Sequence, residues 1–334
     1  MSGGAKCRGL SLMSGGLDSQ LAVCVLRDAG AEMEAICFET PFFGADKARA
    51  AAERLGMKLH VLDFTADEIA LVKNPPHGFG GAMNPCIDCH ATMIRRAGEL
   101  MSRLGFDFVS TGEVLNQRPM SQNRQSLGVV ENASGLKGRL VRPLSAKLLE
   151  PTIPEIEGKL DRERLLALSG RRRDPQIELA THYGLVDYPS PAGGCKLTEE
   201  GFSRKLRDLL EHEGLDDLGL VRLLVKGRRF RLEGGSSVIL GRDANENMEL
   251  AAFRSGADVL IVPTSIGGPT ALMPSRGGFI PPEADIESAV RIVAGWSRPT
   301  EGPISVEITA DGVRRNVEVV QQPLRVDFKL RQIM

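Results

Sequence analysis

The sequence predicts an α/β protein in which a parallel-sheet domain is followed by a smaller α+β domain. Two patterns predict this. Apolar β-type runs alternate with amphipathic helical stretches up to about residue 200, and short β-type runs broken by glycine replace them after about residue 215. The length of 334 residues also favours two domains, since single domains commonly have about 150 residues. We therefore expect domains at 1–215 and 216–334.

The first domain is predicted to alternate strands and helices. Strands are expected at 9–13, 33–38, 58–64 and 106–110, and helices at 17–29, 46–55 and 92–104. Such an order gives a parallel sheet with helices on both faces, and ligands of these sheets bind beyond the carboxyl ends of the strands. The segment 73–81 is rich in proline and glycine and is expected to be a loop.

The second domain is predicted to be mainly β. Strands are expected at 230–232, 237–240, 259–262, 304–308 and 313–320, with helices only at 245–255 and 286–296. The turn Asp311-Gly312 separates the last two strands. This mixture indicates an α+β domain.

Composition excludes several classes of protein. Lysine and arginine total 42 against 43 aspartate and glutamate, which excludes a strongly basic nucleic-acid coat but leaves room for a local basic face. No apolar run approaches the roughly 18 residues of a membrane span, and the N-terminus lacks the apolar region of a secretory signal. We expect a cytoplasmic protein without membrane contact, and a homodimer is left open.

Ser14-Gly15-Gly16-Leu17-Asp18-Ser19 is the sharpest local motif and lies between the first strand and the first helix. Glycine lets the backbone N–H groups approach a phosphate, and a helix N-terminus adds further donors. The hydroxyls of Ser14 and Ser19 can donate, and Asp18 can hold a Mg²⁺ that shields pyrophosphate. The alternative is a tight turn capped by Ser14. Neither G-x-x-x-x-G-K-[ST] nor G-x-G-x-x-G occurs at this turn, which disfavours P-loop NTPases and Rossmann dehydrogenases.

Six cysteines are too few for a disulfide scaffold, so a cluster of them indicates metal binding or reactivity. Cys86 and Cys89 form a Cys-x-x-Cys at a helix start, and Cys195 lies in the loop 189–195, rich in proline and glycine. Two thiolates at this spacing can converge on iron or zinc. The alternatives are a redox dithiol, a structural zinc site with His90 or another histidine, and a persulfide pair of Cys89 and Cys195. We interpret Cys7, Cys24 and Cys37 as small core residues.

Two arginine clusters are candidates for RNA contact. One is Arg171, Arg172 and Arg173, and the other contains Arg228 and Arg229 next to a phenylalanine. Arginine forks suit phosphates, and an aromatic ring can stack on a base. The alternative is a solvated charged face. Gln117-Arg118 is a weaker candidate for contact with ATP or uridine.

Ser14 to Ser19 resembles the S-G-G-x-D-S motif of the PP-loop ATP pyrophosphatases, whose domain is adenine nucleotide alpha hydrolase-like. The resemblance implies that ATP is cleaved between its α and β phosphates while AMP is placed on a substrate oxygen. It also implies the residues that contact ATP: Met13, Ser14, Gly15, Gly16, Asp18, Ser19, Phe38, Thr111 and Gly112.

The stretches 84–112 and 187–195 resemble the PP-loop tRNA thiouridine synthetases, whose members with Cys-x-x-Cys plus a distal cysteine look like [4Fe-4S] enzymes. The resemblance implies that Cys86, Cys89 and Cys195 hold such a cluster, which is favoured over Zn²⁺, and that Asp18 and Cys195 are catalytic. The implied activity is an ATP-dependent tRNA sulfurtransferase making 4-thiouridine or 2-thiouridine. The same resemblance implies that the protein uses Mg²⁺ and acts on tRNA. It also implies that sulfur comes from an external donor, either sulfide or a cysteine desulfurase.

Two other functions are left open. One is a PP-loop amide- or nitrile-forming ligase acting on a small molecule, with Cys86 and Cys89 in a structural zinc site. The other is an RNA-binding protein whose nucleotide loop is regulatory.

The second domain has a resemblance of its own. Residues 241–247, followed by a helix and Ala257-Asp258, are similar to the G-R-N-x-x-x-N pattern of the NFACT RNA-binding domain. Asp243 departs from that pattern, and the aromatic-and-histidine stretch of that domain is missing after Asp258. The resemblance implies that the second domain docks tRNA.

Overall fold

The computed structural model describes residues 6–189, 194–322 and 332–333. Part of the proline- and glycine-rich loop expected before Cys195, residues 190–193, lies outside the described residues. The chain forms two compact units, Met1–Thr198 and Glu199–Met334, which are described in turn.

The first unit contains a parallel five-stranded sheet of order β3-β2-β1-β4-β5. Its strands are β1 (Arg8–Leu12), β2 (Glu32–Glu39), β3 (Leu59–Asp63), β4 (Phe108–Ser110) and β5 (Leu140–Val141). The chain runs outward from β1 to β3 and then returns to place β4 on the other side of β1. The sheet therefore reverses its order between β1 and β4, where ligand crevices form in such folds.

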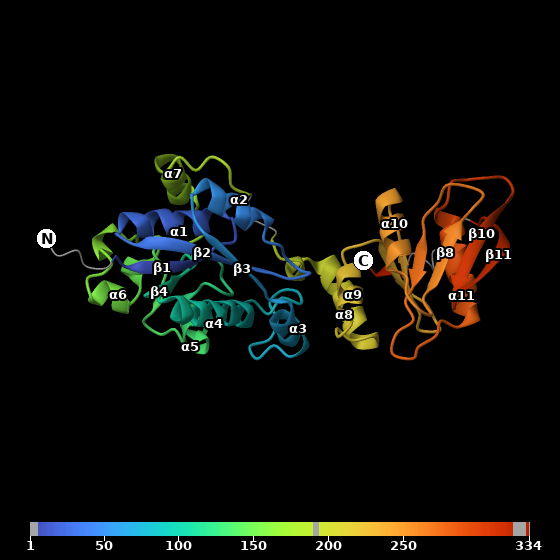
Figure 1. Cartoon of the computed structure of the whole chain (residues 1–334), viewed down its shortest axis with the longest axis horizontal. Helices are drawn as coiled ribbons and strands as arrows, with labels where there is room; N and C mark the ends of the chain where they lie inside the picture. The colour runs from blue at the N-terminus through green and yellow to red at the C-terminus, as the bar shows by residue number, and fades with distance from the viewer. Residues whose placement is uncertain (1–5, 190–193, 323–331, 334) are drawn as a thin grey trace. The chain divides into compact units, whose positions relative to one another are not determined.

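Helices cover both faces of this sheet, as predicted (Figure 1). One face packs against α1 (Leu17–Asp28), α2 (Asp46–Arg54) and α7 (Asp174–His182), and the other against α4 (Cys86–Leu104) and α5 (Arg124–Ser134). Alternate residues of β2 point to opposite cores: Ala35 and Cys37 to the first, Ile36 and Phe38 to the second. The remaining helical segments are α3 (Thr65–Lys73), α6 (Ile153–Ile156) and the short 3-10 turns η1 (Ala146–Leu148), η2 (Arg162–Arg164) and η3 (Lys196–Thr198).

The expected elements of this unit are present, and the structure adds segments for which no prediction was made, among them β5, α5, α6 and α7. Helix α4 begins at Cys86 rather than residue 92, so the whole Cys-x-x-Cys lies in its first turn. Helix α3 was not predicted, because only Ile69 and Val72 mark its apolar face and the Asp63 carboxylate starts it by accepting the Thr65 N–H at 2.8 Å. The predicted core cysteines Cys7, Cys24 and Cys37 are buried.

The second unit contains an antiparallel seven-stranded sheet of order β11-β10-β8-β9-β7-β6-β12. Its strands are β6 (Arg228–Arg231), β7 (Ser237–Leu240), β8 (Val259–Pro263), β9 (Ala271–Met273), β10 (Pro303–Ala310), β11 (Val313–Val320) and β12 (Gln332–Ile333). Helix α11 (Glu283–Trp296) packs its buried side chains on this sheet, and α10 (Ala244–Phe253) lies beside β9. Strands β9 and β12 were not predicted, because runs of two or three residues carry no usable periodicity.

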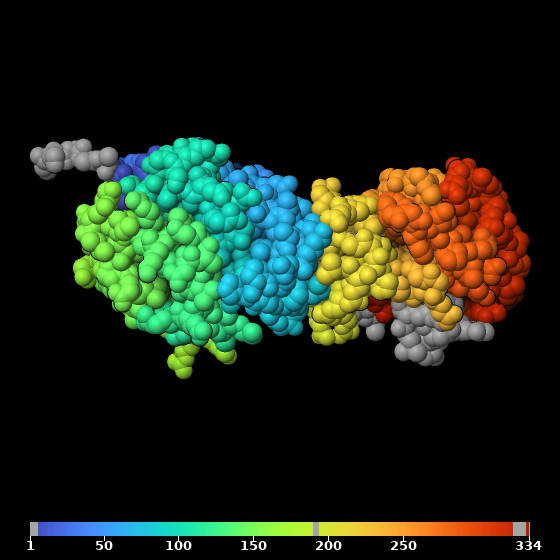
Figure 2. All heavy atoms as spheres, turned by 90° about the horizontal axis from the view of Figure 1, so that it is seen from below, coloured from blue at the N-terminus to red at the C-terminus, as the bar shows by residue number. Residues whose placement is uncertain are grey.

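Helices α8 (Glu200–His212) and α9 (Leu218–Leu223) belong to the second unit, although the sequence placed the boundary near residue 215. Arg231 of β6 donates to Asp208 of α8 at 2.6 and 3.0 Å and to Glu213 at 2.8 and 3.0 Å. Figure 2 shows the yellow surface of these helices continuous with the orange surface of the sheet domain. The apolar faces of α8 and α9 do not indicate, from the sequence alone, which of the two sheets the helices pack against.

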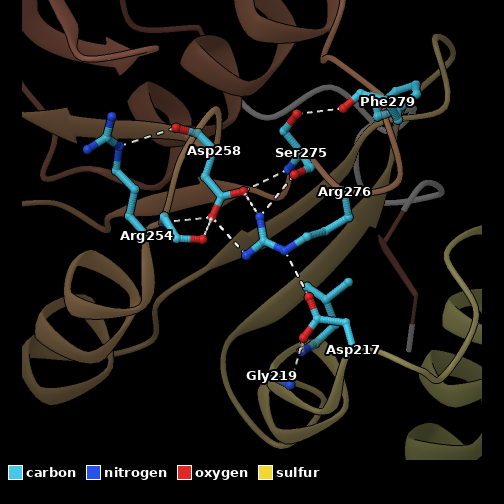
Figure 3. Close-up of polar contacts among 9 residues, drawn as sticks. Asp217, Gly219, Arg254, Asp258, Ser275, Arg276 and Phe279 are labelled. Carbon is cyan, nitrogen blue, oxygen red and sulfur yellow. Dashed lines mark hydrogen bonds and ion pairs between the residues drawn. The ribbon is translucent and has the colours of Figure 1, made fainter.

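A buried carboxylate, Asp258, fixes α9 and the loops around β8 (Figure 3). Asp258 is fully buried and accepts the N–H groups of Ser255 at 2.9 Å and Ser275 at 2.8 Å. Arg276 forms an ion pair with Asp258 and also donates at 2.8 Å to Asp217, which caps α9 by accepting the Gly219 N–H. Asp258, one of the residues of the NFACT-like pattern, therefore has a structural role.

Replacing Asp258 should destabilise the second unit. We expect Asp258→Asn to lower the free energy of unfolding by about 3 kcal/mol, because the variant removes the buried one of the two carboxylates that pair with Arg276 and weakens the acceptor of the Ser255 and Ser275 N–H groups. Urea denaturation followed by the fluorescence of Trp296, the single tryptophan of the chain, measures this loss. Glu287→Gln is the control, because its ion pair with Arg291 is exposed. Equal midpoints for the two variants would contradict the role given to Asp258.

Candidate nucleotide and cysteine site

The glycine motif forms the turn between β1 and α1, as expected. Gly15 has a φ of +78°, and a Cβ there would lie 2.4 Å from the backbone of Lys47. The turn is closed internally, since the Ser19 hydroxyl donates to the Gly16 carbonyl at 2.8 Å and Gln20 donates to the Gly15 carbonyl at 3.0 Å. No side chain caps the first turn of α1. The N–H groups of that turn are thus oriented as an anion-binding end of a helix.

Asp18, the carboxylate expected to hold Mg²⁺, is contacted by two side chains from distant parts of the chain. Gln117 donates to its Oδ2 at 2.9 Å, and Arg173 lies 3.5 Å from its Oδ1. Arg173 was predicted to contact RNA, whereas its guanidinium lies at the glycine loop. Arg171 and Arg172 are exposed, as an RNA-facing cluster requires.

Thr111 and Gly112 follow β4 and lie against the same loop. A Cβ on Gly112 would come within 2.6 Å of the backbone of Asp18 and Ser19, so only glycine allows this approach. The Thr111 hydroxyl donates to Glu113 at 3.0 Å. Thr111 and Gly112 thus lie beside the motif, where the sequence placed them.

Glu113 is the centre of a buried polar network that connects the glycine loop to the cysteine helix. It is contacted by Arg142 Nε at 2.9 Å and by His90 Nδ1 at 3.1 Å. Burial on its own would raise the pKa of Glu113, but the charge of Arg142 and the contact with His90 outweigh burial and lower this pKa to about 2. The carboxylate is therefore ionised at neutral pH and fixes the orientation of both partners.

The three predicted cysteines come together in the first unit. Cys86 accepts a hydrogen bond from Asn84 at 3.1 Å, and Cys89 donates to the fully buried Glu68 at 3.1 Å. Cys195 precedes η3, and the N–H of the next residue, Lys196, donates to the Phe42 carbonyl just beyond β2 at 3.0 Å. Each thiol contributes to the electrostatic environment of Cys89 or Cys195, which shows that the three lie near one another.

The thiols of Cys89 and Cys195 have raised pKa values. Burial raises the pKa of Cys195 to about 12 and that of Cys89 well above its usual value, and the neighbouring Glu68 acts in the same direction. Burial also raises the pKa of Glu68 to about 7. Metal binding here must release protons from the thiols.

Within residues 6–189, 194–322 and 332–333, no group of three or more histidine, cysteine, aspartate or glutamate side chains is arranged to hold a metal ion. The donor set itself fits the chemistry of an iron or zinc site, since the buried Cys89 and Glu68 and the half-buried Cys86 and Cys195 act on one another electrostatically. His90 points to Glu113 rather than to the thiols, which disfavours it as a zinc ligand.

Three other predicted site residues are less accessible than expected. Met13 and Phe38 are 2% and 5% exposed, and Phe38 packs on Phe64 with ring centroids 5.3 Å apart. Only their backbones can therefore border a nucleotide. Arg229 is 1% exposed, and its guanidinium lies inside the second unit, 3.8 Å from Asp208. This burial contradicts the RNA contact predicted for Arg229. Phe230 faces the core of the second unit, and Arg229 on the opposite face of β6 is buried next to Asp208 of α8.

The sequence did not identify Glu68, Glu113 and Arg142 as parts of the site. Glu113 follows Thr111-Gly112 directly, and that position was the available signal. Glu68 lies on the unpredicted helix α3, and Arg142 follows the two-residue strand β5. Their convergence depends on contacts between residues far apart in the chain.

Comparisons with known proteins divide the chain in the same way. Residues 4–148 match the family model described as thiamine biosynthesis protein (ThiI), and residues 227–327 match the NFACT protein RNA binding domain. A tRNA-specific 2-thiouridylase MnmA of Marinobacter nauticus is 25% identical over 59% of this chain and 52% of its own length. A probable tRNA sulfurtransferase of Caldanaerobacter subterraneus is 30% identical over 40% of this chain and 35% of its own.

The chain thus spans about half or less of these curated relatives. A solved 4-thiouridine synthetase–RNA complex with bound ATP aligns over 65% of this chain and 52% of its own at 19% identity. The TM-score of this alignment is 0.38.

The fold and the glycine loop define the first unit as a PP-loop α/β domain. The chain is similar to the ThiI family over residues 4–148 and to the NFACT RNA-binding domain over residues 227–327, which supports the two resemblances of its motifs. None of the helices in the described parts of the chain is long and apolar enough to cross a membrane.

The Glu113 network should make stability fall in acid. The pKa of Glu113 in the folded protein, about 2, lies below its ordinary value of 4.5. The Glu113 carboxylate therefore stabilises the folded protein above pH 4.5, and this contribution disappears as the pH falls toward 2. The shift corresponds to about 3 kcal/mol. We expect Glu113→Gln to be less stable at pH 7 and to lose less free energy of unfolding between pH 6 and pH 3.

Urea unfolding across that pH range tests this prediction. Glu99→Gln is the control, because the Glu99 carboxylate is exposed and pairs with surface arginines. A Glu113→Gln variant with the pH profile of the wild-type protein would disprove the assignment.

Proposed function

We propose that the protein is an ATP-dependent tRNA sulfurtransferase that adenylates a uridine carbonyl and replaces its oxygen with sulfur, forming 4-thiouridine or 2-thiouridine. The match of residues 4–148 to the ThiI family and the names of the curated relatives support this proposal. We also propose that the protein works in the cytoplasm and that it receives sulfur from sulfide or a cysteine desulfurase.

One structural observation carries the proposal. A chain of contacts leads from the cysteine helix to the glycine loop: His90, next to Cys89, contacts Glu113, which accepts from Thr111, and Gly112 touches the backbone of Asp18. A nucleotide at the loop and a sulfur group at the cysteines would therefore act within one unit on one substrate.

The first step is adenylation. The uridine carbonyl oxygen forms a bond to the α-phosphorus of ATP, and the bond from that phosphorus to the pyrophosphate oxygen breaks. The uncapped N–H groups at the start of α1 would hold the departing pyrophosphate, since charge develops on its oxygens.

Asp18 would hold Mg²⁺, which neutralises charge on the phosphates when bound. A single carboxylate is enough for an ion that keeps its waters and takes phosphate oxygens as further ligands. Gln117 and Arg173 hold the Asp18 carboxylate in position, and Arg173 also brings positive charge to the place of the phosphates.

The second step is the displacement of AMP. Sulfur attacks the ring carbon that bears the adenylated oxygen, and AMP leaves with that oxygen. Cys86, Cys89 and Cys195 would hold a [4Fe-4S] cluster, which when bound supplies an iron able to carry sulfide. Glu68, in contact with Cys89, is positioned to take up the proton that a thiol releases.

ATP cleavage should depend on both Asp18 and tRNA. We expect the purified protein to form AMP and pyrophosphate when tRNA is present, and Asp18→Asn to lower this rate by about 100-fold, the order of magnitude for losing one electrostatic contact. Glu53→Gln, an exposed change on α2, should leave the rate unaltered. Mass spectrometry of the tRNA nucleosides identifies the thiouridine. AMP formation indifferent to tRNA would refute the proposed function.

The three cysteines should bind iron as a set. We expect anaerobic reconstitution to give a Mössbauer spectrum of a [4Fe-4S] cluster, and Cys86→Ala, Cys89→Ala and Cys195→Ala each to lose it. Cys24→Ala is the matched control, because Cys24 is a buried cysteine of α1. A colourless protein that binds zinc, or a persulfide detected on Cys195, would overturn the cluster assignment.

A further inference from the structure

The second unit contains an open groove of about 460 Å³ beside the start of α10. Arg228 and Arg242, Asn247, Gly268, and Trp296 and Arg298 are among its lining residues. The volume lies within the range of small-ligand sites, roughly 300–1,000 Å³, and is suited to one nucleotide rather than a duplex.

Positive charge in the groove is only partly neutralised. Arg242 is held by Glu246, which accepts from its Nε at 3.0 and 3.1 Å. Arg228 and Arg298 have no acidic partner among the residues that the structure describes. Two guanidiniums facing an open groove without a carboxylate favour an anionic ligand.

The groove also contains a flat stacking surface. The guanidinium carbon of Arg228 lies 4.1 Å from the centre of the Trp296 ring system. The indole holds this guanidinium by a cation–π contact, which fixes a planar group at the groove wall. Unpaired RNA bases stack on arginine planes of this kind as well as on aromatic rings.

The motif at residues 241–247 holds the walls of the groove together, in addition to supplying the charge of Arg242. Asn247 Oδ1 accepts the Thr270 N–H at 2.9 Å, and its amide donates to the Gly268 carbonyl at 3.3 Å, which ties the opposite wall to α10. A Cβ on Gly241 would lie 2.1 Å from Asn247, so glycine is needed for this fit. Asp243, the departure from the NFACT pattern, caps α10 by accepting the Glu246 N–H at 3.0 Å.

We propose that this groove binds one unpaired nucleotide of an RNA, with its base stacked on the Arg228–Trp296 pair and its phosphate at Arg298. The proposal rests on the proposed function, because it gives the tRNA substrate a specific docking point. RNA is favoured over an acidic peptide because a stacking plane and free guanidiniums occur together, and because the RNA-binding family match covers these residues.

The single tryptophan of the chain reports directly on the groove. We expect a single-stranded oligouridylate to change the fluorescence of Trp296 in the full-length protein, and a duplex RNA of equal length to bind about tenfold more weakly. Arg298→Ala and Arg228→Ala should each weaken the single-strand affinity by about tenfold. The slope of log K against the logarithm of the salt concentration should become less steep by about 0.7 in a variant that loses one phosphate contact.

Arg291→Ala is the matched control, because this exposed arginine lies on α11 and pairs with Glu287. Arg298→Lys should keep part of the affinity, and equal urea midpoints confirm that the variants are folded. Anisotropy of a labelled oligonucleotide measures binding independently of the indole. Equal affinity for the duplex, equal affinity for polyglutamate, or unaltered affinity of both groove variants would overturn the proposal.

The binding assay contains no ATP and is repeated with Cys86→Ala, so it is separate from thiolation. If RNA binds through the groove but no AMP forms with tRNA, the proposed function fails and the groove assignment stands. If AMP forms with tRNA and the groove variants bind RNA normally, the proposed function stands and the groove assignment fails.

Discussion

The contact between Gly112 and the first turn of α1 is the constraint on which the first unit depends. The sheet reverses its order between β1 and β4, and at this reversal a side chain on residue 112 would overlap the backbone of Asp18. Since the segment after β4 lies directly against the glycine loop, the residues that follow it, Glu113 and Gln117, are brought to the same edge of the sheet. The glycine loop and the residues around it are thus positioned by backbone geometry.

The buried Glu113 network extends this geometry to the cysteines. A carboxylate removed from water is stable here only because Arg142 and His90 satisfy it, and leaving any one of these groups unpaired would be costly. The same requirement fixes the first turn of α4, where Cys89 lies, relative to the end of β4. Cys195 joins them through the Lys196 contact with the segment after β2.

The second unit uses arginine in two different ways. Arg231 and Arg276 are structural, since each joins a helix or loop to the sheet through carboxylates. Arg228 is held by an aromatic ring instead, and Arg298 has no carboxylate partner in the described part of the chain, so their charges face solvent. Arginines that pair with carboxylates stabilise the fold, whereas arginines without such a partner are available to a ligand. A cluster of basic residues in the sequence does not show which arginines belong to which group.

Local residue patterns by themselves determined the first four strands of the first unit, the helices α1, α2 and α4 between them, and the glycine turn after β1. These follow from periodicity and from the special backbone freedom of glycine, which act over a few residues. Only the tertiary structure decided that Arg173 reaches Asp18, that Arg229 is buried, that Glu68 meets Cys89, and that α8 and α9 belong with the second sheet. Those outcomes depend on which surfaces compete to be buried and on charge pairs between distant segments, and neither is encoded in local spacing.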